Sequence, residues 1–260
     1  MSVFHRLIDD EGHYIALHTI IATGDAVVVV QREDVAVKMA IVYKYDTLEQ
    51  VEANRERIRR EQEVWRRVQS DFDTPVEGIV HCLDLPGETI EMRYMSGGTL
   101  SKWLKHRARP CIKLQQRWFR QLAIGLHNLH QRCIIHCDIL TRNILMDGSQ
   151  NLVIADLGAS RVMPIDTVMA DAVDEFECSI WTDLCQLGLV FYEIATGRHP
   201  GISLYHTRGS HDPSAVFPTQ DRLPVLSEGL WARDIIETCW RKGGYGMAGA
   251  AGILTKLDSV

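Results

Sequence analysis

The side chains best suited to chemistry lie in two short polar clusters within otherwise apolar sequence. In the first, His136, Asp138 and Asn143 have the spacing His-x-Asp-x-x-x-x-Asn. In the second, Asp156 ends an apolar run and is followed by Leu-Gly. Asp and Asn oxygens are hard ligands, suited to Mg²⁺ that carries phosphates. Either cluster alone is explained as well by Asp- and Asn-rich turns, but the two in this order and spacing favour phosphoryl transfer.

Composition narrows the class of protein. A chain of 260 residues that is 46% hydrophobic can bury a large core, and its net charge of −6 gives no support for nucleic-acid binding. The seven cysteines include no Cys-x-x-Cys pair, which favours free thiols in a reducing compartment over a disulfide framework or a zinc site. No apolar run approaches the roughly 18–20 residues of a membrane span, and the N-terminus shows no secretory signal. We therefore expect an intracellular, cytoplasmic protein with no nucleic-acid or membrane partner.

The two polar clusters also carry a resemblance to a known family. His136-Cys137-Asp138 with Asn143, and Asp156-Leu157-Gly158, resemble the catalytic loop and the metal-binding triplet of the eukaryotic protein kinases. The form His-Cys-Asp is similar to that of kinase-like proteins from filamentous fungi. The resemblance implies an α+β, bilobal protein-kinase-like fold with a small β-rich N-lobe and a mainly helical C-lobe. We expect the N-lobe over residues 1–95 and the C-lobe over residues 96–260.

The N-lobe should contain several strands and one helix. Residue types predict strands at Tyr14–Ile21, at Ala26–Val30 and from Val35 onward. Lys38 is the only charged residue in the third of these, where a strand-face lysine that reaches solvent is one interpretation. Val-Ala-Val-Lys also resembles the kinase strand whose lysine contacts the phosphates of the nucleotide.

Leu48–Val68 is highly charged, with opposite charges at i,i+4 spacing that support a helix. In kinases the helix after the lysine strand supplies a glutamate that pairs with that lysine. We expect Glu61 in this role because it precedes Trp65 by one turn on the apolar side, with Glu63 as the alternative. A solvated charged face accounts for most of the remaining helix.

Two further strands, Gly78–Leu85 and Thr89–Met95, are predicted around a Pro-Gly turn. The second runs into Ser-Gly-Gly and resembles the kinase hinge. The resemblance places Met92 at the back of an adenine pocket, with the backbone of Arg93 and Met95 at the adenine edge. An ordinary strand followed by a flexible linker is the alternative.

Helices predicted from apolar spacing complete the C-lobe at Leu114–Gln131, Trp181–Gly197 and Gly229–Trp240. The second resembles the central C-lobe helix of kinases, which opens with an aspartate. Asp183 should then be structural and hold the backbone of the catalytic loop.

The resemblance assigns a role to each candidate residue. Lys38 would hold the phosphates and be held by Glu61, Asp156 and Asn143 would bind Mg²⁺, and Asp138 would accept the proton of the attacking hydroxyl. The remaining residues expected to contact ATP are Gly24, Ala26, Ala36, Met92, Arg93, Met95 and Leu145.

Several positions depart from the family pattern. Gly24 is the one glycine left in the phosphate-covering loop, because Thr19 and Ile21 stand where two others would be. Cys137 replaces the arginine that pairs with a phosphorylated activation segment in many kinases. No Ala-Pro-Glu triplet precedes Asp183.

The sequence therefore predicts ATP- and Mg²⁺-dependent phosphoryl transfer to hydroxyl groups of a protein substrate, serine or threonine rather than tyrosine. The altered glycine loop and the missing triplet leave a pseudokinase that binds nucleotide or acts as a scaffold as the first alternative. A small-molecule phosphotransferase is the second, and the oligomeric state stays open.

Overall fold

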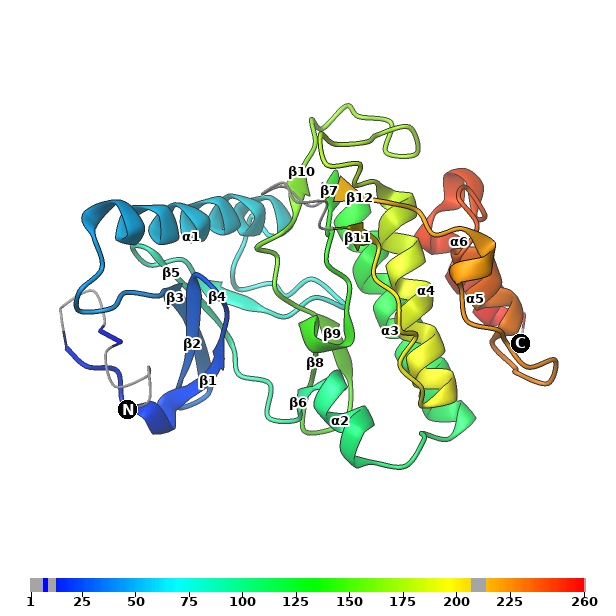
Figure 1. Ribbon diagram of the computed structural model, residues 1–260, viewed down its shortest axis with the longest axis horizontal. Helices are drawn as coiled ribbons and strands as arrows, with labels where there is room; N and C mark the ends of the chain where they lie inside the picture. The colour runs from blue at the N-terminus through cyan, green and yellow to red at the C-terminus, as the bar shows by residue number, and fades with distance from the viewer. Residues whose placement is uncertain (1–6, 9–12, 207–213, 260) are drawn as a thin grey trace. The chain divides into compact units, whose positions relative to one another are not determined.

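We describe the fold from a computed structural model that covers residues 7–8, 13–206 and 214–259 (Figure 1). The chain divides into two compact units. The first comprises residues 1–76 and 80–95, and the second comprises residues 77–79 and 96–260. Among the helices of the described residues, none combines the length and apolar character needed to cross a bilayer.

The first unit is built on an antiparallel five-stranded sheet with the order β1-β2-β3-β5-β4. Its strands are β1 (Ile20–Thr23), β2 (Val27–Arg32), β3 (Val35–Ala40), β4 (Cys82–Asp84) and β5 (Thr89–Arg93). One buried cluster on this sheet contains Leu7, Val28, Val30, Val37, Met39 and Ile41. Two of the predicted strands were too long: a 3₁₀ turn, Leu17–Thr19, occupies much of the predicted Tyr14–Ile21, and β4 covers only part of Gly78–Leu85.

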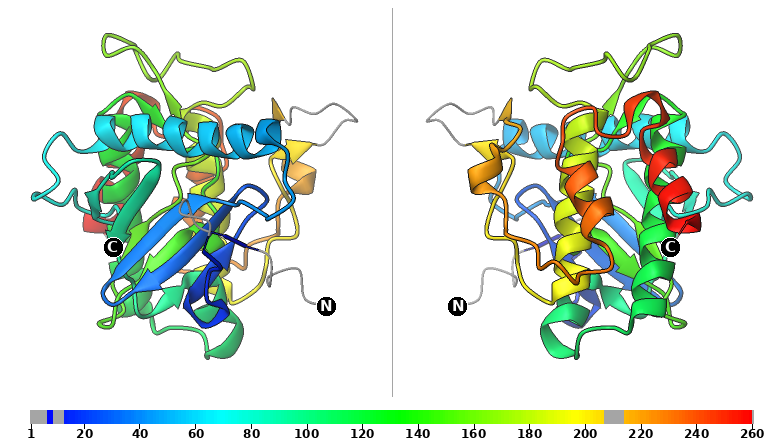
Figure 2. Two further views of the ribbon diagram at one scale, coloured as in Figure 1. Left: turned by 90° about the vertical axis from the view of Figure 1, so that its left-hand side faces the viewer. Right: turned by 90° about the vertical axis from the view of Figure 1, so that its right-hand side faces the viewer.

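Helix α1 (Leu48–Val68) packs on β3 and β5 and has the bounds predicted from the sequence. Figure 2 shows it beside the sheet. Its start is fixed by a capping box, in which Thr47 Oγ1 accepts from the amide of Gln50 and the Gln50 side chain accepts from the amide of Thr47. The face toward the sheet buries Ile58 and Trp65, which sets the rotation of the helix.

The second unit is mainly helical. Its helices are α2 (Leu100–His106), α3 (Ile112–His130), α4 (Ile180–Thr196), α5 (Arg233–Cys239) and α6 (Ala250–Asp258). Helix α3 packs on α4 and α6, and α4 packs on α5. The rings of Phe119 and Phe191 stack between α3 and α4 at 3.8 Å. Helix α5 is shorter than the predicted Gly229–Trp240, while α4 ends at Gly197 in the left-handed conformation that glycine adopts readily.

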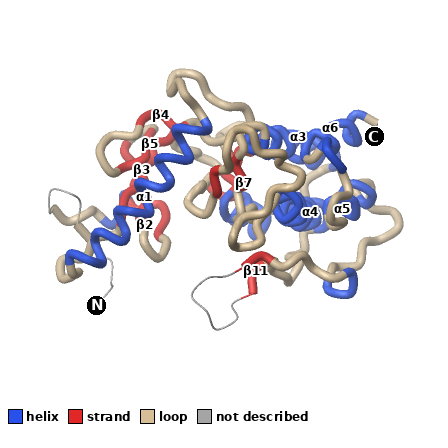
Figure 3. Tube along the Cα trace, turned by 90° about the horizontal axis from the view of Figure 1, so that it is seen from above, coloured by secondary structure: helices blue, strands red, loops and turns tan. Residues whose placement is uncertain are grey.

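Short strands carry the polar loops of this unit. β6 (Gly98–Thr99), β8 (Ile144–Met146) and β9 (Leu152–Ile154) form one sheet. β7 (Ile134–Ile135) pairs with β10 (Arg161–Val162), and β11 (Tyr205–His206) pairs with β12 (Ser214–Ala215). Residues 163–179, all within the described part, contain neither helix nor strand and are drawn as loop in Figure 3.

Candidate functional site

In the first unit, Lys38 and Glu61 form a buried ion pair. Lys38 Nζ lies 2.6 Å from Glu61 Oε2, and the two side chains are only 6% and 2% exposed. Glu61 points to the sheet because it lies between Ile58 and Trp65 on the buried face of α1. Glu63 is exposed on another face. Because a buried charge is costly without a partner, this pair fixes the position of the lysine ammonium group.

The other candidate residues of this unit lie on the sheet or its turns. Ala26, Ala36, Met92 and Met95 are buried, and Ala36 is directly opposite Met92 across β3 and β5. The amide of Arg93 donates to His81 O at 2.9 Å, so this N–H is already used by the sheet.

Gly24 lies in the turn between β1 and β2, where its amide donates to Val27 O at 2.8 Å. Its φ is not in the left-handed range, and an added Cβ would approach Val27 Cγ2 only to 3.4 Å. The turn therefore does not require glycine for its own conformation.

In the second unit, side chains of helix α4 hydrogen-bond to the backbone of the loop between β7 and β8. Asp183 is fully buried, and its carboxylate accepts from the amides of His136 and Cys137, each at 2.8 Å. His130 Nε2 also donates to it at 3.0 Å. One turn along, Gln186 accepts from the amide of Ile139 and donates to Cys137 O. The predicted structural role of Asp183 is confirmed by these contacts.

His136 connects this loop to the segment that carries Asp156. Its Nδ1 accepts from the amide of Asp138 at 3.2 Å, so its Nε2 is the donor to Ala155 O at 3.2 Å. A second link runs from the amide of Ala155 to Asn143 O at 2.9 Å. Asp138, Asn143 and Asp156 are thus carried by backbone segments that are hydrogen-bonded to one another.

The carboxylate of Asp138 is held by two neighbours. Asn143 Nδ2 donates to Asp138 Oδ2 at 2.7 Å and to its carbonyl at 2.9 Å. Arg142 Nη2 lies 2.9 Å from Oδ2 and 3.2 Å from Oδ1. Asn143 is buried, whereas the Asp138 side chain stays 23% exposed. The carboxylate is therefore fixed in orientation and still reachable from solvent.

Asn143 and Asp156 carry the oxygen atoms that could hold a metal ion. Since the amide nitrogen of Asn143 is turned to Asp138, its oxygen points away from that carboxylate. Asp156 follows β9 with an exposed side chain and φ 61°, a left-handed value that few residues other than glycine adopt. A carboxylate and an amide oxygen are donors of the kind that Mg²⁺ prefers. Leu145 is half-buried in β8, opposite Thr99.

Comparison with known proteins decides the family. The protein kinase domain model matches residues 20–212 of the chain. The chain belongs to the protein kinase family. The expected α+β fold is confirmed by this match and by a β-sheet unit followed by a helical unit.

Similar kinases come from distant organisms. The chain is 28% identical to the mitogen-activated protein kinase kinase kinase dlk-1 of Caenorhabditis elegans over 137 residues, 48% of this chain and 15% of that protein. It is 31% identical to the serine/threonine-protein kinase Nek8 of Danio rerio over 122 residues, 41% of this chain and 17% of that protein. The probable serine/threonine-protein kinase MARK-B of Dictyostelium discoideum is 25% identical over 162 residues, 56% of this chain and 22% of that protein. The matched regions cover less than a quarter of each of these kinases.

Two side chains of this kinase site were given no role from the sequence. Gln186 lies one helical turn after Asp183, so the 3.6-residue period could have indicated that both face the same loop. Arg142 stands four residues after Asp138, but no rule of spacing applies because the intervening loop is not an α-helix.

Proposed function

We propose that this kinase transfers the γ-phosphoryl group of ATP to a hydroxyl group of a protein. The observation that carries the proposal is the Asp138 carboxylate, which is partly exposed and fixed by Asn143 at 2.7 Å. A carboxylate in this state can orient an attacking hydroxyl and accept its proton. The names of the similar proteins, two of which are called serine/threonine-protein kinases, support serine or threonine as the acceptor.

Each remaining group has one task in this proposal. Asn143 and Asp156 would hold Mg²⁺, which when bound neutralises charge on the phosphates. Lys38 would contact the α- and β-phosphates, and the ion pair with Glu61 keeps its ammonium group in place. The adenine ring would contact the apolar side chains of Ala26, Ala36, Met92, Met95 and Leu145, the backbone of Arg93, and the turn at Gly24.

A nucleotide-binding pseudokinase is the second candidate, and Arg142 is the observation that favours it. Its guanidinium group contacts both oxygens of Asp138. An attacking hydroxyl group would have to compete with this guanidinium group for the carboxylate oxygens. The single glycine of the β1–β2 turn also limits how closely backbone amides approach phosphate.

The first experiment is transfer of labelled γ-phosphate from ATP with Mg²⁺ to the chain itself and to a protein mixture. Asp138→Asn and Asp156→Asn should each lower transfer by at least about 10²-fold, since proton acceptance and charge stabilisation contribute about that much. The matched control is Asp166→Asn, an exposed aspartate that should leave transfer unchanged. Absence of transfer by the unaltered chain, with a nucleotide-dependent rise in melting temperature, would refute catalysis and support the pseudokinase.

A further inference from the structure

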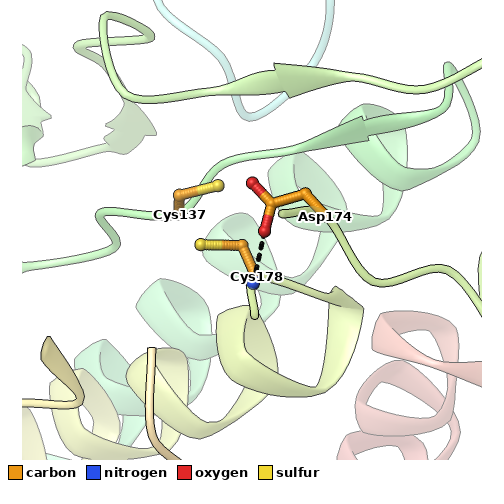
Figure 4. Close-up of side chains that lie close together, drawn as sticks. All are labelled: Cys137, Asp174 and Cys178. Atoms are coloured by element: carbon orange, nitrogen blue, oxygen red, sulfur yellow. Dashed lines mark hydrogen bonds between the residues drawn. The ribbon is translucent and has the colours of Figure 1, made fainter. Parts of the chain in front are cut away.

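Three side chains of the second unit lie close together (Figure 4). Cys137, Asp174 and Cys178 place their sulfur and carboxylate atoms within 4.8 Å of one another. Cys137 adjoins Asp138 in the loop, whereas Cys178 lies near the end of the segment 163–179 that precedes α4. Both thiols are almost fully buried. This cluster has no part in the proposed phosphoryl transfer.

We propose that Cys137 and Cys178 are an oxidative modification site, at which a hydroperoxide converts the two thiols to a reversible intramolecular disulfide. The proposal concerns the sulfur chemistry only and does not depend on kinase activity. In a reducing compartment such a bond is a transient, redox-sensing one.

The backbone on each side of the pair is held by a hydrogen bond. Cys137 has φ 67°, and its amide donates to the buried Asp183 at 2.8 Å. The amide of Cys178 donates to Asp174 Oδ1 at 2.6 Å, as Figure 4 shows. Cys178 also directly precedes Ser179, whose side chain caps α4. The backbone is therefore held on both sides of the pair, and the two sulfur atoms lie within 4.8 Å of one another, close enough for small side-chain movements to bring them to bonding distance.

Both oxygens of the Asp174 carboxylate already accept hydrogen bonds, which argues against a metal site. Asp174 Oδ1 accepts from the amides of Phe176 and Cys178. Its Oδ2 accepts from Arg161 Nε at 3.1 Å, and this guanidinium group also lies over the Phe176 ring. A cation bound by Asp174 would face the positive charge of Arg161, whereas a disulfide carries no charge.

The surroundings of the pair suit an apolar product. The two cysteines pack in a cluster with Ile135 and Ala215, against the partly buried Met163, Met169 and Phe176. A disulfide has no polar hydrogen to satisfy in such a place. Met163, Met169 and Phe176 come from the segment 163–179, and Tyr205, which also packs on the cluster, comes from β11. Entry of a small oxidant requires these covering side chains to move while the backbone at the two cysteines stays in place.

The two thiols are not equivalent, and the difference orders the steps. The hydrogen bond with Cys178 raises the pKa of Cys137, and the same bond lowers the pKa of Cys178. The Tyr205 hydroxyl, 3.5 Å from Cys178 Sγ, also lowers the pKa of Cys178. Cys178 is therefore the better nucleophile.

The reaction balances with one molecule of hydrogen peroxide. The Cys178 thiolate attacks the peroxide, the O–O bond breaks, and a sulfenic acid forms while the displaced oxygen leaves as water after it takes up a proton. The sulfur of Cys137 then attacks Cys178 Sγ, and the S–O bond breaks as the second water leaves with the Cys137 proton. Two thiols are oxidised and the peroxide oxygens are reduced to water.

The test is peroxide treatment of the folded chain, followed by alkylation, trypsin digestion and mass spectrometry without reductant. The expected product joins Cys137 to Cys178 and has lost two hydrogen atoms. Tandem fragmentation must locate the bond, because the tryptic peptides also carry Cys133 and Cys185. The matched control is Cys111→Ser, which removes the exposed thiol and should leave the bond intact.

Further variants and a reductant distinguish this bond from a cross-link elsewhere in the chain. Cys178→Ser should abolish the cross-link, and Cys137→Ser should do the same if the first variant folds poorly. Dithiothreitol should reverse the bond, and its formation should raise the melting temperature on the order of 5–10 °C, because it closes a long loop of chain.

Three results would overturn the proposal. The first is that both thiols stay fully alkylatable after oxidation, and the second is that they cross-link only in the urea-denatured chain. The third is that Zn²⁺ alone protects both thiols and a chelator releases them without any disulfide, which would assign a metal site instead.

Discussion

Replacing Asp183 with asparagine should destabilise the chain by about 3–5 kcal/mol, because its carboxylate is buried and accepts three hydrogen bonds. The asparagine oxygen can stay with the two donors at Oδ2, His136 N and His130 Nε2. The new NH₂ group then faces the amide of Cys137, a donor 2.8 Å away. A lost bond to a charged group accounts for about 1.5–3 kcal/mol, and an unsatisfied buried amide adds about 1–3 kcal/mol.

Thermal and urea unfolding would measure this change. For a chain of this size, the loss corresponds to a melting temperature lower by roughly 10 °C. Gln186→Leu should give a smaller loss, since it removes two neutral hydrogen bonds from the same loop. Asp166→Asn is the matched control, because that side chain is exposed. A change of less than about 1 kcal/mol for Asp183→Asn, with unaltered hydrogen exchange at the Cys137 amide, would refute the view that α4 holds the catalytic loop.

Three more predictions follow from single contacts. Gly125→Ala should destabilise by about 2 kcal/mol, although alanine normally favours a helix, because its Cβ would lie 2.3 Å from Gly78 O; a raised melting temperature would contradict this. Burial raises the pKa of the Glu193 carboxyl from 4.5, because the charged form is less favourable in the folded chain than in the unfolded chain. The stability of the folded chain should therefore fall as pH rises from 4.5 through the raised value. Glu193→Gln should therefore raise the melting temperature at neutral pH but not below pH 4.5, and a pH-independent difference would argue against it. In a double-mutant cycle, Lys38→Met and Glu61→Leu should each lower the free energy of unfolding by about 3–5 kcal/mol, and the double variant should lose clearly less than the sum of the two. Additive losses would exclude coupling between the two side chains.

The elements that could be predicted are those whose ends are set by local sequence. Helix α1 begins at the capping box of Thr47 and Gln50, and opposite charges at i,i+4 spacing support its length. Helix α4 ends at Gly197, a left-handed glycine. The strand predicted over Tyr14–Ile21 began too early, because a partly apolar stretch does not by itself distinguish a strand from the 3₁₀ turn Leu17–Thr19 that precedes β1.

The predicted strand Gly78–Leu85 was too long for a different reason. Gly78 has φ 77°, and its backbone lies against Gly125 in helix α3. This contact joins residues far apart in the sequence, so neither residue type nor alternation along the strand reveals it. The strand begins only where the chain can pair with β5, at Cys82.

In the candidate site too, some features follow from local sequence and others only from contacts between distant residues. The choice of Glu61 over Glu63 as the neighbour of Lys38 could be made from the helical period, because one face of α1 is apolar. The contact between Cys137 and Cys178 could not, because Cys178 lies in a segment without periodic pattern. Only the fold brings these two thiols together.

At position 137 an arginine could both bind a phosphate on the activation segment and help to order the loop, whereas Cys137 can do neither by charge. A cation at this position would link the loop to a phosphate on the activation segment, whereas a neutral thiol cannot. The loop backbone nevertheless has its own supports, since Asp183 and Gln186 make four hydrogen bonds with the backbone of residues 136, 137 and 139. Order of the catalytic loop therefore does not require a charge at residue 137. A disulfide between Cys137 and Cys178 would tie the segment 163–179 to this loop. Oxidation should therefore reduce the mobility of that segment and leave the positions of Asp138 and Asn143 unchanged.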